Sequence, residues 1–504
     1  MNRKKRQKKA SHPILFFFTL LLAITLPWMK NVVGRVTFDE IIFHLSMPLR
    51  GTDTTLFVSF LWKVLLPTAA ICAGIALLRR NGQRIRAWFS PNKEARSEAR
   101  PQVWVKALQK YSGGVLACLL IAELATLCHQ LSLEAYIVNR LHSSPWIEEN
   151  YVVPDEKNLT WPERKRNLIY IYLESMEASY MSKEDGGFYA DNYIPELTKL
   201  ARQNISFSDK ETKLGGVWSL MGTTWTMGAM FAQTSGLPLK IIGDVNAMSQ
   251  YKTFYPGAVT LGDLLEDAGY KNILMIGSDR FFAGREIYFG EHGDYEMCDY
   301  NWAVENDKIP WDYWQYWGFE DEKLIEMAKE KLLEVSEQDE PFNLTLLTVD
   351  THFPDGYRCR LCQNQWGHVY KDVISCASRQ ISQFVAWIQQ QDFYENTTII
   401  LSGDHLSMAS LIESEIPAEK KRTVYNCIVN AAAQPVQTQN RIFTSLDMFP
   451  TTLAALGVQI DGERLGLGTN LFSDTPTLVE EIGYDELEKN VSLHSKFFDS
   501  LAHE

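Results

Sequence analysis

The chain has 504 residues, of which 46% are hydrophobic, and 62 Asp+Glu against 49 Lys+Arg give it a net charge of −13. Residues 1–112 hold 19 basic and 5 acidic residues, which leaves 30 basic and 57 acidic residues, a net charge of −27, for the remainder. A body this acidic argues against nucleic acid as a partner, because binding to a phosphate backbone requires a basic surface. The length and the apolar content predict a large core and more than one structural unit.

Three apolar stretches near the N-terminus are long enough to cross a bilayer, namely residues 12–29, 55–78 and 113–133. The first follows a basic leader, as in a signal peptide, but no small-x-small cleavage site comes after it and two further stretches do. We therefore expect residues 1–134 to form a membrane region with about three transmembrane helices.

The segments that flank these stretches differ in their number of basic residues. The N-terminus has six and residues 79–112 have nine, whereas residues 30–54 have three. By the positive-inside rule the N-terminus and the 79–112 loop are cytoplasmic, so three crossings place everything after about residue 134 outside the cytoplasm. The stretch 38–45 lies on the same outer side and could pack on the soluble body.

Beyond residues 135–165, which have the proline-rich, polar composition of a linker, the pattern alternates between strands and helices. Apolar β-branched runs predict buried strands at 168–173, 272–276, 343–349, 397–402 and 423–430. Helical spacing is found at 260–268, 321–337, 371–390 and 446–456. This alternation predicts an α/β layered domain with a largely parallel sheet over residues 166–475, followed by a C-terminal tail over 476–504.

Functional side chains in such a sheet gather at the carboxyl ends of the strands. Glu174 follows the first predicted strand, and Asp404 and His405 follow the fourth after Gly403, which lets the backbone turn sharply. Singly, Glu174 could be a helix cap and Asp404 a turn residue. Together, an acid and an Asp-His pair at one sheet edge indicate a site for Mn²⁺, Mg²⁺ or Zn²⁺.

Residues 222–238 combine glycine and threonine with a short apolar stretch that stops at Gly236 and Pro238. This composition predicts a tight loop, one or two helical turns and a helix end. Thr226 would lie at the helix N-terminus, where unpaired N–H groups favour an alkoxide or a phosphate. The alternative is that these threonines are ordinary helix caps.

Two further strand ends carry groups that suit phosphate. His352, after the strand at 343–349, could hold a phosphate oxygen or protonate a leaving group, or could be a loop histidine bonded to backbone. Arg280 and Arg285 follow the strand at 272–276, and the planar guanidinium fork donates two hydrogen bonds at once. Surface ion pairs are the alternative, more so for Arg280 than for Arg285.

These motifs together resemble the sulfatase and alkaline-phosphatase superfamily, and within it the lipoteichoic acid synthase and phosphoglycerol transferase branch, which includes the transferases that decorate periplasmic glucans. The motifs are Leu173-Glu174-Ser175, Thr226 ten residues before Gly236-Leu237-Pro238, His352, and Gly403-Asp404-His405. The stretches 38–45 and 465–472 resemble that branch as well. The resemblance covers roughly residues 160–475 and extends to the architecture of the membrane region.

The resemblance implies a membrane-anchored transferase that works in two steps at one divalent metal ion, commonly Mn²⁺ in this branch, with Mg²⁺ and Zn²⁺ as alternatives. The implied donor is phosphatidylglycerol and the implied acceptor is an envelope glycan or polyol. Carried over by motif, the metal ligands would be Glu174, Thr226, Asp404 and His405. Thr226 would also be the nucleophile, His352 would contact the substrate phosphate, and Arg285 would grip the phosphoglycerol head.

The sequence departs from sulfatases at the nucleophile, where they carry Cys or Ser and this chain carries Thr226, which argues against hydrolysis of sulfate esters. Thr223 and Thr224 are near enough to compete for the role of nucleophile. Two other functions stay open, namely a phosphoethanolamine transferase of the same fold and a catalytically dead, membrane-anchored glycan-binding protein.

The cysteines of the outer domain are relevant to the cellular compartment, because disulfides form outside the cytoplasm. Cys359, Cys362 and Cys376 lie close together in sequence, whereas Cys298 and Cys427 lie elsewhere in the outer domain. Outside the cytoplasm a disulfide within residues 359–376 is the leading expectation, with the pairing left open. A small zinc site would need a fourth ligand, for which His368 is the candidate.

Overall fold

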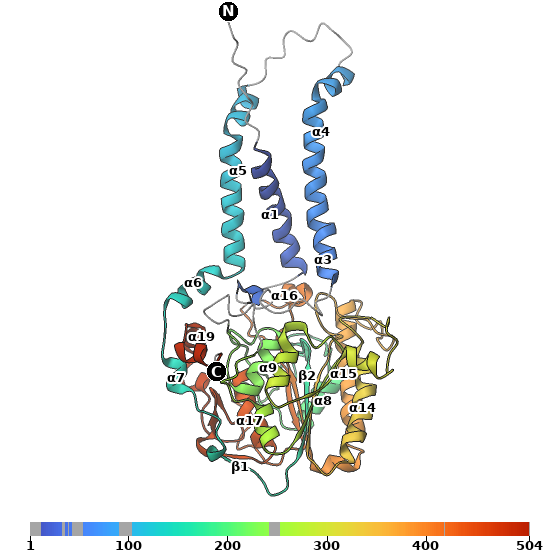
Figure 1. Cartoon of the computed structure of the whole chain (residues 1–504), viewed down its shortest axis with the longest axis vertical. Coiled ribbons are helices and arrows are strands. Elements are labelled where there is room, and N and C mark those ends of the chain that lie inside the picture. Colours follow the sequence, from blue (N-terminus) through green and yellow to red (C-terminus); the bar gives the residue numbers. More distant parts are fainter. Residues whose placement is uncertain are drawn as a thin grey trace, which may run out of the picture. The chain divides into compact units, whose positions relative to one another are not determined.

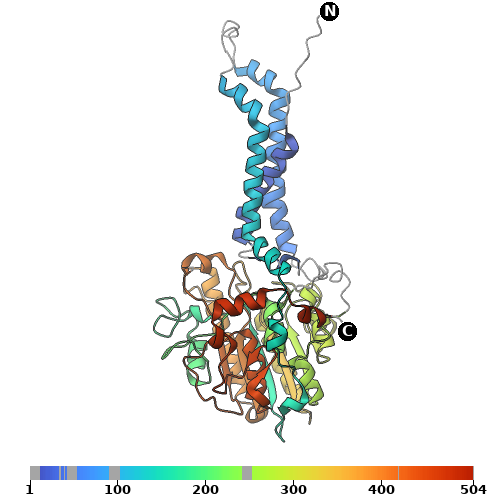
Figure 2. The same ribbon diagram turned by 90° about the vertical axis from the view of Figure 1, so that its left-hand side faces the viewer.

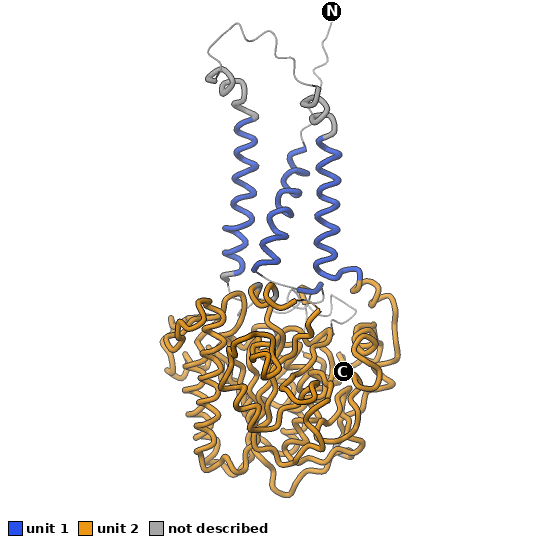
Figure 3. The backbone as a smooth tube through the Cα atoms, turned by 180° about the vertical axis from the view of Figure 1, so that it is seen from behind, with its two compact units in different colours: residues 1–38, 53–134 blue, residues 39–52, 135–504 orange. Residues whose placement is uncertain are grey.

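The computed structural model describes residues 12–32, 36–38, 40–42, 54–89, 103–240, 253–417 and 419–502. It divides into two compact units, coloured separately in Figure 3. By the roles that the sequence leads us to expect, we call residues 1–38 and 53–134 the membrane unit and residues 39–52 and 135–504 the catalytic unit. The catalytic unit is therefore made of two pieces of chain that are far apart in sequence.

The membrane unit consists of long apolar helices. They are α1 (Pro13–Val32), α3 (Thr54–Phe60), which continues through a π-helical turn (Leu61–Leu65) into α4 (Leu66–Phe89), and α5 (Val103–Gln130). Within them, Pro13–Val32, Leu56–Leu78 and Ser112–Gln130 are long and apolar enough to cross a membrane, with mean hydropathies of 1.6 to 1.9. A helix satisfies its own backbone hydrogen bonds, which a bilayer interior requires. The three spans coincide with the three apolar stretches of the sequence.

A six-stranded sheet, of which β2 is labelled in Figure 1, forms the centre of the catalytic unit. The order of its strands is β4-β3-β5-β2-β6-β7. Its strands are β2 (Asn167–Leu173), β3 (Lys271–Ile276), β4 (Glu296–Cys298), β5 (Phe342–Leu347), β6 (Thr397–Gly403) and β7 (Asn426–Val429). Only the β6–β7 pair among them is antiparallel. The predicted α/β class with a largely parallel sheet is thus confirmed.

Helices cover both faces of the sheet, which explains why its central strands are continuous runs of buried residues. Alternate residues of β2 enter opposite cores, Tyr170 and Tyr172 on one side and Ile169 and Ile171 on the other. On the tyrosine side pack α9 (Thr226–Ser235), α11 (Leu261–Asp267), α12 (Arg285–Glu291) and α17 (Met448–Ala455), and on the isoleucine side α8 (Pro195–Gln203), α14 (Asp321–Ser336) and α15 (Val369–Ile388).

Residues 135–165, expected as a linker, and 476–504, expected as a tail, both fold onto the catalytic unit. The first segment carries the end of α6 (Leu133–Leu141), α7 (Trp146–Asn150) and β1 (Leu159–Thr160), which pairs with β8 (Gln459–Ile460). The second carries α18 (Leu478–Ile482), α19 (Tyr484–Ser492) and α20 (Lys496–Ser500), in red in Figure 2. Ile147 and Phe498, each 1% exposed, show why: both segments supply apolar side chains to the core.

The chain between the first two membrane spans also contributes to the catalytic unit. Glu40 is 3% exposed, and one of its carboxylate oxygens accepts a 2.7 Å hydrogen bond from the Thr224 hydroxyl. Ile42 packs against the core on the tyrosine side of the sheet. The expected packing of the 38–45 stretch on the soluble body is thus present at these two residues, whereas Asp39 and residues 43–45 lie outside the described residues.

Candidate active site

Glu174 is placed by the end of β2. It is 2% exposed, and the next residue, Ser175, turns the chain with a φ of 52°. This turn lets the Ser175 amide donate to Asp404 Oδ1 at 2.7 Å and the Ser175 hydroxyl donate to Glu174 Oε1 at 2.8 Å. One carboxylate is oriented by a hydroxyl and the other by a backbone amide, so both are fixed before any ligand binds.

Asp404 and His405 are placed by the end of β6. Gly403 is required there, because a Cβ atom would lie 2.1 Å from the Met176 carbonyl oxygen. Asp404 Oδ1 accepts from the His405 amide at 2.7 Å as well as from Ser175, whereas Asp404 Oδ2 is buried without a hydrogen-bond partner among the described residues. His405 Nδ1 lies 2.8 Å from the Leu406 carbonyl and donates to it, which leaves the Nε2 lone pair facing the carboxylates.

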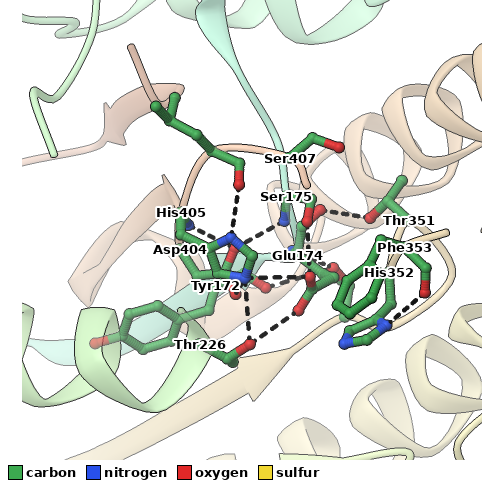
Figure 4. A network of polar contacts seen from close by, with 12 residues as sticks. Tyr172, Glu174, Ser175, Thr226, Thr351, His352, Phe353, Asp404, His405 and Ser407 are labelled. Atoms are coloured by element: carbon green, nitrogen blue, oxygen red, sulfur yellow. Dashed lines mark hydrogen bonds and ion pairs between the residues drawn. The ribbon is translucent and has the colours of Figure 1, made fainter. Parts of the chain in front are cut away.

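Thr226 is the first residue of α9, and its hydroxyl faces this group (Figure 4). Its Oγ1 lies 3.3 Å from Glu174 Oε2 and 3.4 Å from His405 Nε2. Thr223 bonds instead to the backbone of Leu220, and Thr224 bonds to Glu40. Of the three threonines that the sequence offered, Thr226 therefore has its hydroxyl beside the carboxylates and at the helix N-terminus.

The spacing of these atoms suits one metal ion. Ligand atoms of Glu174, Asp404 and His405 all lie within 4.8 Å of one another, and His405 Nε2 is 3.5 Å from an oxygen of each carboxylate. Atoms about 2.1 Å from a tetrahedral ion are separated by about 3.4 Å, which the distances involving Thr226 also match. This Glu-Asp-His group therefore indicates a divalent metal site.

The electrostatics of the cluster also suit a cation. Burial raises the pKa of Asp404 to about 7, with the neighbouring Glu174 as the next cause. Burial lowers the pKa of His405, but Asp404 and Glu174 outweigh it and raise the pKa to about 10. Two buried carboxylates need a positive charge between them, so a proton and a metal ion compete for the same place.

A pocket opens beside the cluster, lined by Glu174, Thr226, Ser278, Phe282, Arg285, Trp317, Leu347, Thr348, Val349 and His352. The His352 ring lies between Trp317 and Phe353, with ring centroids 4.7 Å from each, and its Nδ1 is 2.9 Å from the Phe353 carbonyl oxygen. Burial lowers the pKa of His352 despite the opposing charge of Glu174. These surroundings favour a neutral imidazole in the free protein, and this imidazole would gain a proton when an anion binds.

Arg285 brings a buried cation to the same pocket. It is 5% exposed, its Nη1 donates to Ser278 Oγ at 2.7 Å, and its Nε has no hydrogen-bond partner among the described residues. Burial lowers the pKa of Arg285 to about 10, partly offset by Glu174 and Asp404, so the guanidinium stays charged at neutral pH. Arg280 instead forms an ion pair with Glu286, with Nε and Oε1 3.3 Å apart.

The structure thus brings together all six residues predicted from the sequence, Glu174, Thr226, Arg285, His352, Asp404 and His405, whereas their chemical roles remain predictions. It adds supporting residues that the sequence did not single out. Thr348 Oγ1 accepts from the Glu174 amide at 2.9 Å. Glu177 accepts from the Ser407 amide at 2.8 Å and from Arg422 Nε at 3.0 Å, which holds the loop after His405. Thr348 lies near the end of the strand predicted at 343–349 and directly follows β5, so it could have been found, but no local pattern links Glu177 to Arg422.

Two buried acids anchor the loop that carries His352. Asp321, at the start of α14, accepts from the amides of Val349 at 2.7 Å and Asp350 at 3.2 Å, and Asp350 Oδ1 accepts from the Asp321 amide at 3.1 Å. Burial raises the pKa of Asp321 to about 7, and burial followed by the charge of Asp321 raises that of Asp350. Both acids therefore favour the protonated form in the folded protein.

This pair predicts a pH-dependent stability. A raised folded-state pKa contributes stability that is complete below the unfolded pKa of about 4 and is lost as pH rises through about 7. We expect the melting temperature to fall as the pH rises from about 4 to about 7, and to fall less in Asp321→Asn. Calorimetry of both proteins in the same buffers measures this difference, and equal slopes for the two would contradict it.

The parallel sheet, the buried acid-histidine cluster and the pocket with its buried arginine are the features of an enzyme that acts on a charged ester at a metal ion. The sulfatase family model matches residues 166–458, more than half of the chain, so the chain belongs to the sulfatase family.

The curated relatives are phosphoglycerol transferases, which confirms the resemblance to that branch. Phosphoglycerol transferase I of Xanthomonas campestris pv. campestris (strain B100) is 31% identical over 331 residues, 64% of this chain and 45% of the relative. That of Escherichia coli (strain 55989 / EAEC) is 32% identical over 327 residues, 63% of this chain and 40% of the relative. The chain thus spans less than half the length of these relatives.

A solved structure supports the fold. A protein of the alkaline phosphatase superfamily from Vibrio parahaemolyticus superposes with a TM-score of 0.50 at 19% identity, covering 69% of this chain and 80% of that one. This likeness concerns the fold alone.

Proposed function

We propose that this protein is a membrane-anchored, metal-dependent phosphotransferase that moves phosphoglycerol from phosphatidylglycerol to a hydroxyl of an envelope glycan or polyol. One observation carries the proposal: the Thr226 hydroxyl, at a helix N-terminus, lies 3.3 Å from Glu174 and 3.4 Å from His405 in a pocket that also contains Arg285 and His352. The names of the curated relatives support phosphoglycerol as the transferred group.

In the first step the Thr226 oxygen attacks the phosphorus of the donor, so that an O–P bond to Thr226 forms and the bond to the diacylglycerol oxygen breaks. The proton that the Thr226 hydroxyl loses balances the proton that the released diacylglycerol oxygen gains. Glu174, Asp404 and His405 would hold one divalent ion, Mn²⁺ in first place and Mg²⁺ or Zn²⁺ as alternatives, which lowers the pKa of the bound hydroxyl and offsets charge on phosphorus oxygens. The N–H groups of the first turn of α9 stabilise the threonine oxygen anion.

In the second step a hydroxyl of the acceptor attacks the phosphothreonine-type ester and displaces Thr226, which regains its proton. Arg285 and His352 contact the phosphoglycerol group through both steps, because both line the pocket beside Thr226. The guanidinium fork donates to phosphate oxygens in a fixed geometry, which positions phosphorus for each attack.

The membrane setting fits both substrates. Three apolar helices tether the chain where a lipid donor is at hand. The basic residues of the N-terminus and of the 79–112 loop favour the cytoplasmic side for those segments. We therefore infer a multi-pass protein with its catalytic unit outside the cytoplasm, where envelope glycans are found.

The test uses the full chain in detergent with Mn²⁺ and phosphatidylglycerol that carries a fluorescent acyl chain. Fluorescent diacylglycerol should be released, and no diacylglycerol should come from phosphatidylethanolamine labelled in the same way. Release from phosphatidylethanolamine alone would make the protein a phosphoethanolamine transferase. Bound metal without release from either lipid, also after a polyol acceptor is added, would contradict the proposal.

Arg285→Lys tests the grip on phosphate. The ammonium keeps the charge but loses the fork, and a hydrogen bond to a charged group contributes about 1.5–3 kcal/mol, so kcat/KM should fall about 10- to 100-fold. Most of the loss should appear in KM. Arg280→Lys, in an ion pair at the same strand end, is the matched control and should leave both constants nearly unchanged. Equal effects of the two substitutions would contradict the role of Arg285 in binding the phosphate.

A further inference from the structure

Three cysteines gather away from the active-site carboxylates. Cys359 and Cys362 lie in the loop between β5 and α15, and Cys376 lies within α15. The Cys359 sulfur is 3.6 Å from that of Cys362 and 3.7 Å from that of Cys376, and all three sulfurs lie within 4.8 Å of one another. Cys359 and Cys376 are 5% and 2% exposed, and Cys362 is half-buried. The transfer reaction uses none of them.

The sequence favoured a disulfide here, but in the structure all three cysteines are free thiols. A disulfide brings two sulfurs to about 2.05 Å and would leave the third sulfur unpaired. Thiolates about 2.3 Å from one tetrahedral Zn²⁺ are separated by about 3.8 Å. The observed separations of 3.6 and 3.7 Å are close to that spacing, and Cys359 is the sulfur near both of the others.

The surroundings supply what such a site needs. Gln380 lies one helical turn after Cys376, and its amide nitrogen is 3.5 Å from that sulfur and 3.9 Å from that of Cys359. Amide oxygen and nitrogen exchange places by a half-turn of the side chain, after which the oxygen would face the sulfurs.

His368, the fourth ligand considered from the sequence, has a different place. It is the N-cap of α15, where its Nδ1 accepts from the Tyr370 amide at 3.2 Å. Gln380 therefore takes its place as the candidate fourth ligand.

We propose that Cys359, Cys362 and Cys376, closed by Gln380, form a second, structural metal site that takes a thiophilic divalent cation, with Zn²⁺ as the preferred ion. Soft thiolates select Zn²⁺, whereas the oxygen-rich cluster of Glu174 and Asp404 suits a harder ion such as Mn²⁺. Because their ligands differ, the two sites would therefore select different metal ions.

The site would fasten the loop that carries His352. That loop runs from β5 through His352 to Cys362, and it holds its own fold through bonds such as Gly356 N to His352 O, 3.0 Å. A cation bound to Cys359 and Cys362 on the loop and to Cys376 on α15 would fix it to the helix that packs on the sheet. The prediction rests on the thiol geometry and does not depend on which phosphate ester the enzyme uses.

The test replaces the metal of the full-length protein, purified without reductant, by Co²⁺. Thiolate bonded to Co²⁺ gives an intense near-ultraviolet charge-transfer band, which the active-site cluster, having no sulfur, cannot produce. The band should be present in the wild type and in Thr226→Ala and Cys427→Ser, the latter a buried cysteine outside the cluster, and should be lost in Cys359→Ser and Cys376→Ser. Gln380→Leu should keep the band but bind Co²⁺ more weakly, by at least the roughly 10-fold that loss of a supporting residue costs.

A second measurement needs no variant and so holds even if the cysteine variants fail to fold. In the native wild-type protein the three cysteines should resist alkylation until a zinc chelator is added, and elemental analysis should then show release of one Zn²⁺ per chain. A disulfide between any two of the three in unreduced peptides, or a Co²⁺ spectrum without the band, would overturn the proposal.

Discussion

Replacement of Thr226 by alanine should lower the transfer rate by about 10³-fold or more, because it removes the atom that is expected to form the bond to phosphorus. The fold should survive, since the hydrogen bonds that the Thr226 side chain makes within the described part of the chain are the 3.3 and 3.4 Å contacts to Glu174 and His405. Thr226→Ser keeps a hydroxyl in place and should retain a measurable part of the activity. The measurement is diacylglycerol release from fluorescent phosphatidylglycerol.

The matched control is Thr224→Ala, two residues away, whose hydroxyl bonds to Glu40. The Thr224→Ala protein should release diacylglycerol at nearly the wild-type rate. In addition, mass spectrometry of quenched wild-type enzyme should find the phosphoglyceryl ester on Thr226. If Thr224→Ala abolished transfer while Thr226→Ala did not, the nucleophile would be the other threonine, an alternative that the sequence left open.

Asp404→Asn should abolish metal binding at the active site and should lower the activity more than about 100-fold. Loss of a residue that only supports a metal ligand has a smaller effect, about 10- to 100-fold. Asp404 Oδ2 is buried and has no hydrogen-bond partner among the described residues, so a cation is the group that would compensate its charge. Mn²⁺ should raise the melting temperature of the wild type, because an ion that binds only the folded state stabilises it, and should not raise that of the variant.

Asp447→Asn controls for the loss of a buried carboxylate as such. Asp447 is 2% exposed and accepts from the Thr444 and Thr469 amides at 2.7 and 2.8 Å. This variant should melt at a lower temperature but keep the stabilisation by Mn²⁺. If Mn²⁺ raised the melting temperature of Asp404→Asn as much as that of the wild type, Asp404 would not be a metal ligand.

The central strands could be predicted because they are buried on both faces. β2, β3 and β6 are continuous apolar or β-branched runs, and each begins and ends within one residue of its prediction. β4 was missed because it has only three residues, and two of them, Glu296 and Met297, are half-buried. Residues 135–165 resembled a linker because of their prolines, but tertiary contacts such as the 2.9 Å bond from Val152 N to Gly466 O order them.

The site could be predicted as far as it lies at strand ends. Glu174, Asp404 and His405 directly follow strands whose parallel arrangement brings their ends together. Ser278 and Trp317 line the pocket but lie in irregular segments, where no periodicity marks a side chain as facing a ligand. The pairing of Glu177 with Arg422, 245 residues apart in sequence, depends on the assembled sheet and leaves no local signal.

The contact between Glu40 and Thr224 has a consequence for how the enzyme is made. Glu40 precedes two of the three apolar spans in the chain, whereas Thr224 follows all three. The two partners are therefore synthesised on either side of two apolar helices that are long enough to cross a membrane. A fragment that starts at residue 135 would lack Glu40 and with it the acceptor for the Thr224 hydroxyl.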